Sequence, residues 1–156
     1  MKKLKLYLDT SVLNFALTDK LELSLQKKAT VDLLDEIKQG KYEGYVSEQV
    51  LIEIARAPQE KTKRLNQLVS DLDIESLSFS EEIEGVANKY IAEGIIPVKY
   101  KEDALHLAIA SVNNLDVVVS WNFEHIVKLK TKQGVAVVNT MLGYKPIEIV
   151  SPQEVI

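Results

Sequence analysis

Hydrophobic and polar positions along the chain predict short strands that alternate with helices. Residues 4–8 alternate leucine with Lys5 and Tyr7, which is the two-residue period of a β-strand. From about residue 23 to 38, apolar side chains recur at helical spacing. Further helices are predicted at about 48–57, 59–72, 81–92, 102–113 and 123–130, and further strands at 45–46, 74–77, 116–120, 135–139 and 147–150.

Small residues mark where the predicted helices begin and end. Thr10 and Ser11 are expected to cap a helix that follows the first strand. Ser47 and Ser80 stand where two later helices begin, and Gly40 stands where the helix before it ends. These residues therefore predict turns between the segments that have the periodicity of a helix or a strand.

The alternation of strands and helices predicts the fold class. Short strands separated by helices of roughly ten to fifteen residues are typical of a mainly parallel sheet with helices on both faces. The segment 116–120 is apolar without alternation, as expected for a strand whose two faces are both covered. Because no repeat, linker or low-complexity segment interrupts the pattern, we predict one three-layer α/β domain over residues 1–156.

Composition narrows the class of protein further. The chain has 156 residues, 46% of them hydrophobic and 27% charged, which is ordinary for a globular domain. The absence of cysteine excludes a disulfide scaffold, a thiol nucleophile and any zinc site built on cysteine. A net charge of −4 excludes a bulk-basic protein that coats nucleic acid. No apolar run approaches a membrane span or a signal peptide, so we expect a cytoplasmic protein that does not associate with membranes.

Two polar residues follow predicted strands at the edge where parallel sheets bind ligands. Asp9 comes directly after the first strand, and Asn122 comes two residues after the strand 116–120. Ligands of open parallel sheets bind outside the carboxyl ends of the strands. Each residue taken alone is also explained as a helix cap or a turn residue.

Two further acids lie on helices that are predicted to be buried. Glu53 lies at the edge of the apolar face of its helix, where a carboxylate must be paired, for instance with Arg56 or Lys61, or bound to a metal. Asp103 opens a helix that is apolar on nearly every side, and it is either a dipole-stabilised end residue or a carboxylate presented into a cleft. His106 lies one turn further on, and its default interpretation is a hydrogen-bonded core residue.

Three acids gathered at one place would bind a hard divalent cation such as Mg²⁺ or Mn²⁺, which prefers oxygen ligands. Such a cation can activate water against a phosphodiester bond. Basic residues flank these acids and either form a rim for a phosphate backbone or are solvated helix faces. The candidates for RNA contact are Arg56, Lys61, Arg64 and Lys101.

Four short segments resemble the motifs of PIN domains. They are Leu8-Asp9-Thr10-Ser11, Val50-Leu51-Ile52-Glu53, Glu102 to Ala108 and Ser120-Trp121-Asn122-Phe123. Their order, spacing and predicted strand or helix context together carry the resemblance, which is nearest to the VapC-like ribonucleases of type II toxin–antitoxin systems.

The resemblance implies a three-layer α/β/α domain with endoribonuclease activity that depends on Mg²⁺ or Mn²⁺. It also implies an RNA substrate, an antitoxin partner and a homodimer. The metal-binding acids would be Asp9, Glu53 and Asp103. Hydroxyls that support the first acid would come from Thr10 or Ser11, and Ser120 would be the small polar residue of the last motif.

Asn122 stands where many members of that family have an aspartate. Asparagine keeps a carbonyl oxygen but carries no negative charge, so it would orient water rather than hold a second metal strongly. This departure leaves open a second interpretation, a PIN-like module that binds RNA or protein with weak or lost catalysis. A third is an α/β protein whose acids only cap helices.

Overall fold

A computed structural model describes residues 2–156 and contains one five-stranded sheet. All four strand pairings are parallel, and the order across the sheet is β3-β2-β1-β4-β5. The strands are β1 (Lys5–Leu8), β2 (Glu43–Ser47), β3 (Glu75–Leu77), β4 (Val117–Val119) and β5 (Glu148–Val150). The first strand therefore lies at the centre, with β2 and β4 as its neighbours.

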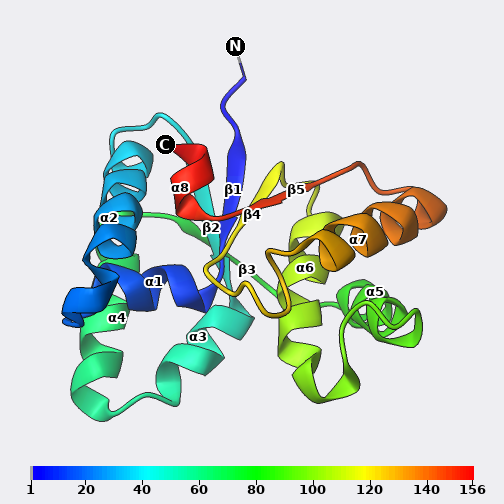
Figure 1. Cartoon of the computed structure of the whole chain (residues 1–156), viewed down its shortest axis with the longest axis horizontal. Coiled ribbons are helices and arrows are strands. Elements are labelled where there is room, and N and C mark those ends of the chain that lie inside the picture. Colours follow the sequence, from blue (N-terminus) through cyan, green and yellow to red (C-terminus); the bar gives the residue numbers. More distant parts are fainter. Residues whose placement is uncertain (1) are drawn as a thin grey trace.

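Helices cover both faces of this sheet (Figure 1). One layer contains α1, α2, α4 and α8, the other contains α5, α6 and α7, and α3 lies across the edge where β1 and β2 end. The helices are α1 (Thr10–Ala16), α2 (Ser24–Lys38), α3 (Glu48–Ala55), α4 (Gln59–Leu72), α5 (Glu81–Ala92), α6 (Lys101–Val112), α7 (Leu129–Leu142) and α8 (Pro152–Val155), with short 3₁₀ turns η1 (Leu21–Leu23) and η2 (Val98–Tyr100). The predicted three-layer α/β/α class is confirmed.

The central strand is buried on both of its faces. Leu6, Tyr7 and Leu8 are all 0% exposed, because a neighbouring strand lies on each side and a helical layer covers each face. Tyr7 is thus as fully buried as the two leucines on either side of it. A tyrosine in such a place must find a hydrogen-bond partner for its hydroxyl inside the protein.

Serine caps begin α3 and α5 as predicted. The Ser47 and Ser80 hydroxyls accept hydrogen bonds from the backbone N–H groups of Val50 and Ile83. The N-cap of the first helix is Asp9 and not Thr10 or Ser11, which agrees with the alternative interpretation of Asp9 as a helix cap. Asp9 has an extended backbone, and its carboxylate accepts a hydrogen bond from the Val12 N–H group at 3.3 Å.

The chain between β4 and β5 differs most from the prediction. We expected a helix at 123–130 and a strand at 135–139, but the structure has irregular turns followed by α7. Val135, Val138 and Asn139 share the buried face of α7, whereas Val137 is 60% exposed. This spacing of three and four residues is helical, so packing overrides the strand preference of a valine-rich segment. Within residues 2–156, no helix is long and apolar enough to cross a membrane.

Candidate active site

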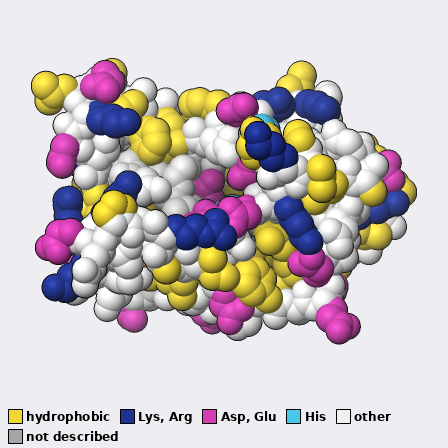
Figure 2. Space-filling model, turned by 90° about the horizontal axis from the view of Figure 1, so that it is seen from below, with side chains coloured by type: hydrophobic (Ala, Val, Ile, Leu, Met, Phe, Trp, Pro, Cys, Tyr) yellow, Lys and Arg dark blue, Asp and Glu magenta, His cyan; other side chains and the backbone are white. Residues whose placement is uncertain are grey.

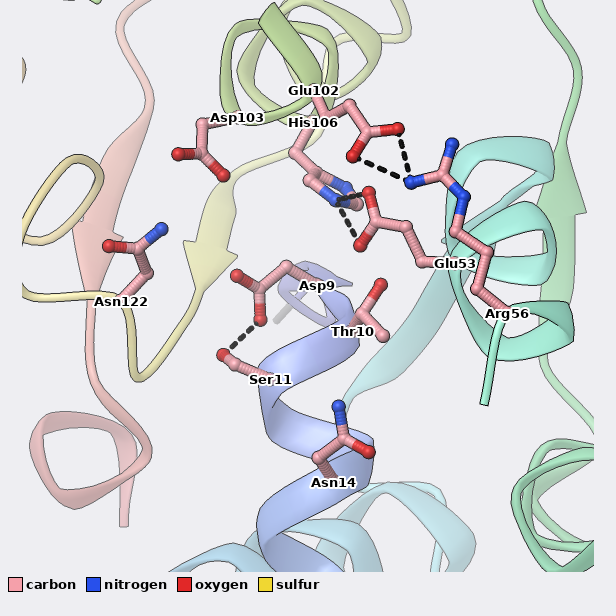
Figure 3. A pocket seen from close by; sticks show the side chains of 10 residues that line it. All are labelled: Asp9, Thr10, Ser11, Asn14, Glu53, Arg56, Glu102, Asp103, His106 and Asn122. Atoms are coloured by element: carbon pink, nitrogen blue, oxygen red, sulfur yellow. Dashed lines mark hydrogen bonds and ion pairs between the residues drawn. The ribbon is translucent and has the colours of Figure 1, made fainter. Parts of the chain in front are cut away.

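The carboxyl edge of the sheet holds a pocket of about 380 Å³ (Figure 3). The four residues singled out from sequence, Asp9, Glu53, Asp103 and Asn122, all line it, although they come from separate parts of the chain. Asp9 follows β1, Glu53 lies on α3, Asp103 begins α6 and Asn122 follows β4. The remaining lining residues are Thr10, Ser11, Asn14, Arg56, Glu102 and His106.

Asp9 is the most deeply placed acid, with 3% of its surface exposed. The Ser11 hydroxyl donates to its Oδ1 at 2.5 Å, and the Ser120 hydroxyl donates to its Oδ2 at 2.5 Å. Burial raises the pKa of the Asp9 carboxyl, although nearby His106 and these hydrogen bonds favour the charged form. The hydroxyl beside this acid is therefore that of Ser11, whereas the buried Thr10 Oγ1 has no hydrogen-bond partner.

Glu53 is held by neither of the cations considered from sequence. Its Oε2 accepts hydrogen bonds from Gln49 Nε2 at 2.7 Å and from His106 Nε2 at 3.0 Å, and its Oε1 lies 3.2 Å from the same ring nitrogen. Burial alone would raise the pKa of Glu53, but the hydrogen bond and the charge of His106, with help from Gln49, lower it to about 2. The imidazole is thus the principal partner of this carboxylate.

His106 connects Glu53 to the centre of the sheet. The imidazole is 2% exposed, and its Nδ1 lies 2.6 Å from the Tyr7 hydroxyl, which in turn lies 2.7 Å from the Ser47 hydroxyl. Burial tends to lower the pKa of His106, but Glu53 outweighs that effect and the pKa is raised. The default interpretation of His106 as a hydrogen-bonded core residue is confirmed. Tyr7 was missed, and its signal was a phenol group between two leucines of the predicted first strand.

Asp103 has a histidine partner as well. His125 Nδ1 lies 3.1 Å from Asp103 Oδ2, and the His125 ring packs against Tyr100 with centroids 3.9 Å apart. The backbone N–H group of His125 donates to Asn122 Oδ1 at 2.9 Å, which fixes the turn after β4. Burial raises the pKa of Asp103 despite the two nearby histidines. No pattern in the sequence indicated the contact between His125 and this acid.

Of the four basic residues considered for RNA contact, only Arg56 lines the pocket. It forms an ion pair with Glu102 at 2.7 Å, and Lys101 pairs with Glu84. Lys61 and Arg64 line a second hollow beside α1 and α4. Figure 2 looks onto this edge of the molecule and shows acidic side chains gathered in a central hollow, with basic and hydrophobic side chains around it.

The atoms that could bind a cation in the pocket are oxygens, the type of ligand that a hard cation prefers. They are carboxylate oxygens, an amide oxygen and two buried oxygens without hydrogen-bond partners, Thr10 Oγ1 and Asn14 Oδ1. As the side chains lie, however, no three acid or histidine side chains within residues 2–156 are gathered as a ready set of ligands. Each carboxylate is instead satisfied by its own protein donors, so a cation would be held partly through water or after side-chain rotation.

Comparison with known proteins supports the fold. No protein-family model matches the chain, and no curated protein sequence matches it. A chain in the crystal structure of VapBC2 from Rickettsia felis, bound to a DNA fragment from its promoter, superposes with a TM-score of 0.60 over 95% of this chain and 98% of that chain. The two are 13% identical, so the likeness shows the fold alone. The chain therefore shares the three-layer α/β/α fold of that chain, which agrees with the fold that its motifs imply.

Proposed function

We propose that this protein is an endoribonuclease that depends on Mg²⁺ or Mn²⁺ and acts as a VapC-like toxin. One observation carries the proposal: the three acids and the amide that were singled out from sequence, on four separate segments, line a single pocket at the carboxyl edge of a VapC-like fold. Local structure does not require this convergence, because the acids are far apart in the sequence. The same edge is where parallel sheets of this kind place their ligands.

Asp9, Glu53 and Asp103 would hold the cation in this proposal. When bound, a divalent ion supplies Lewis acidity and a more acidic water molecule for attack on phosphorus. The residues of the chain keep the site in place: Ser11 and Ser120 fix the orientation of Asp9. Asn122 would orient water through its amide, and Arg56 at the edge of the pocket would attract a phosphate group.

The proposed partners follow from the resemblance and from the VapC-like fold. The substrate would be RNA, cleaved to 5′-phosphate and 3′-hydroxyl ends. An antitoxin protein would neutralise the activity, and the toxin would act as a homodimer in the cytoplasm.

The experiment is a cleavage assay on structured RNAs with Mn²⁺, Mg²⁺ or EDTA. We expect cleavage with either cation and none in EDTA, and a loss of at least about a hundredfold in Asp9→Asn, because removal of one group from an electrostatic site costs that much. Asp32→Asn is the matched control, since Asp32 lies on the surface of α2, where it pairs with Lys28. Equal cleavage by Asp9→Asn and wild type would contradict the proposal.

A second candidate is a PIN-like module that binds RNA or protein without efficient catalysis. Two observations favour it: an amide replaces an acid at Asn122, and the carboxylates are already satisfied by protein donors. This candidate predicts RNA binding that is unchanged by EDTA and by Asp9→Asn, with no cleavage under any condition.

A further inference from the structure

We propose that Tyr7 is a positioning residue for Glu53 and acts on it through His106. Tyr7 belongs to none of the four motifs, and it does not line the pocket. The proposal rests on the proposed function, because it assigns to the buried phenol group the task of orienting one of the cation-binding carboxylates.

Four side chains form a continuous hydrogen-bonded chain from the sheet to the pocket. The Ser47 and Tyr7 hydroxyls are 2.7 Å apart, the Tyr7 hydroxyl and His106 Nδ1 are 2.6 Å apart, and His106 Nε2 reaches Glu53 Oε2 at 3.0 Å. Figure 3 shows the last of these contacts, with His106 between the wall of the pocket and the Glu53 carboxylate.

The direction of the last hydrogen bond is fixed by chemistry. An ionised carboxylate only accepts, so His106 Nε2 must carry the proton that it shares with Glu53. When the imidazole is protonated, Nδ1 donates to the Tyr7 hydroxyl oxygen, and when it is neutral, the Tyr7 hydroxyl donates to Nδ1. In both states Tyr7 holds the ring in the orientation that directs the Nε2–H group at Glu53, in the way that outer partners orient metal-binding side chains.

Burial makes this arrangement rigid. Tyr7 and Ser47 are 0% exposed and His106 is 2% exposed, so no bulk water can replace a missing partner. The Tyr7 and His106 rings also pack with centroids 5.7 Å apart. Without the phenol hydroxyl, His106 Nδ1 would lose its partner inside the core, and the imidazole would be free to turn or to change tautomer.

As a consequence, the two carboxylate oxygens of Glu53 differ in the hydrogen bonds that they accept. Oε2 receives hydrogen bonds from both Gln49 and His106, whereas Oε1 receives only the longer contact of 3.2 Å from His106. Oε1 therefore keeps more of its acceptor capacity for a ligand. A free imidazole would no longer maintain that difference, and the site would bind a cation less tightly.

The test compares Tyr7→Phe with Tyr90→Phe, a matched control elsewhere in the core. Tyr90 is also 0% exposed, and its hydroxyl likewise has two partners, Ser111 at 3.0 Å and Asn139 at 2.5 Å. Mn²⁺ affinity is measured by calorimetry on metal-free protein, melting temperature by calorimetric scanning, and cleavage by kcat and KM.

We expect both variants to lower the melting temperature, because each leaves buried polar groups unpaired. Only Tyr7→Phe should weaken Mn²⁺ binding, by about tenfold, and lower kcat without raising the KM for RNA. In a Glu53→Gln background, Tyr7→Phe should have no further effect on Mn²⁺ affinity, since the side chain that it orients has lost its charge. If Tyr7→Phe does not fold, His106→Gln tests the same connection with the same expected loss.

Three results would overturn the proposal. The first is wild-type Mn²⁺ affinity in Tyr7→Phe, and the second is equal weakening in Tyr90→Phe, which would show a general effect of stability. The third is a wild type that neither binds Mn²⁺ nor cleaves RNA, which overturns the proposed function and this inference together. The first two leave the proposed function standing, so the two failures are distinguishable.

Discussion

Replacement of Glu53 by glutamine tests the electrostatics of the pocket without any ligand. The pKa of Glu53 is lowered from 4.5 to about 2, chiefly because His106 outweighs the cost of burial. A carboxyl group whose pKa is lower in the folded state stabilises the fold above its unfolded pKa. That stabilisation is lost as the pH falls from about 4.5 towards about 2. Glu53→Gln removes the charge and should remove this dependence.

The size of the effect follows from the same values. One pKa unit corresponds to about 1.4 kcal/mol, so a shift from 4.5 to about 2 corresponds to at most roughly 3.5 kcal/mol in the free energy of unfolding. The Glu53 side chain is 19% exposed, which leaves most of this interaction unscreened by solvent. We expect Glu53→Gln to cost about 1–3 kcal/mol at pH 7, and this difference from wild type to shrink by more than half near pH 3.

Urea unfolding in EDTA, at a series of pH values between 7 and 3, measures this difference. Glu102→Gln is the matched control, because Glu102 pairs with Arg56 at the rim and its side chain is 44% exposed. An exposed pair of this kind contributes little, so the control should follow the wild type within about 0.5 kcal/mol. Glu53→Gln and the wild type differ in their free energy of unfolding, and this difference should depend on pH. If it stays constant across the pH series, the lowered pKa of Glu53 and its assignment to His106 are refuted.

Four other substitutions have defined outcomes. In EDTA, Asp103→Asn should raise the melting temperature, because burial disfavours the charged form of Asp103. Addition of Mn²⁺ should then raise the melting temperature of this variant less than that of the wild type. Equal increases in both proteins would mean that Mn²⁺ binds nonspecifically. Asn122→Asp should tighten Mn²⁺ binding about tenfold by calorimetry, and unchanged or weaker binding would remove the argument from a missing charge. Gly134→Ala should cost about 1–3 kcal/mol in urea, because its Cβ would lie 2.5 Å from Ile95 Cγ1. Gly85→Ala, whose Cβ meets nothing within 4 Å, should instead stabilise α5.

Much of the fold was predictable because it depends on local periodicity and on caps. The bounds of α4 and α5 agree with the prediction, since Pro58 precedes the first and the Ser80 hydroxyl caps the second. The segment that became α7 was not predictable in this way. Its valines favour a strand locally, and only the packing of Val135 against the rest of the core decides for a helix.

The candidate site likewise has features that local sequence predicts and features that only the folded structure shows. Its acids were found because each follows a strand or lies on a buried helix, and parallel topology brings such positions to one edge. Their partners were not found, because a contact such as that between His106 and Glu53 joins two helices across the pocket and leaves no mark in either segment. The pairing of Glu53 with Arg56 or Lys61, expected from closeness in sequence, is replaced by pairing across space.

Both ends of the described chain lie beside the start of β1, at the edge of the sheet opposite the pocket (Figure 1). An affinity tag or a surface linker at either end would therefore extend from the side of the molecule that is opposite Asp9 and its neighbours. A chain immobilised through α8 would present the acidic hollow to solution. Surface-based measurements of RNA or antitoxin binding are thus possible without obstruction of the pocket, and from either terminus.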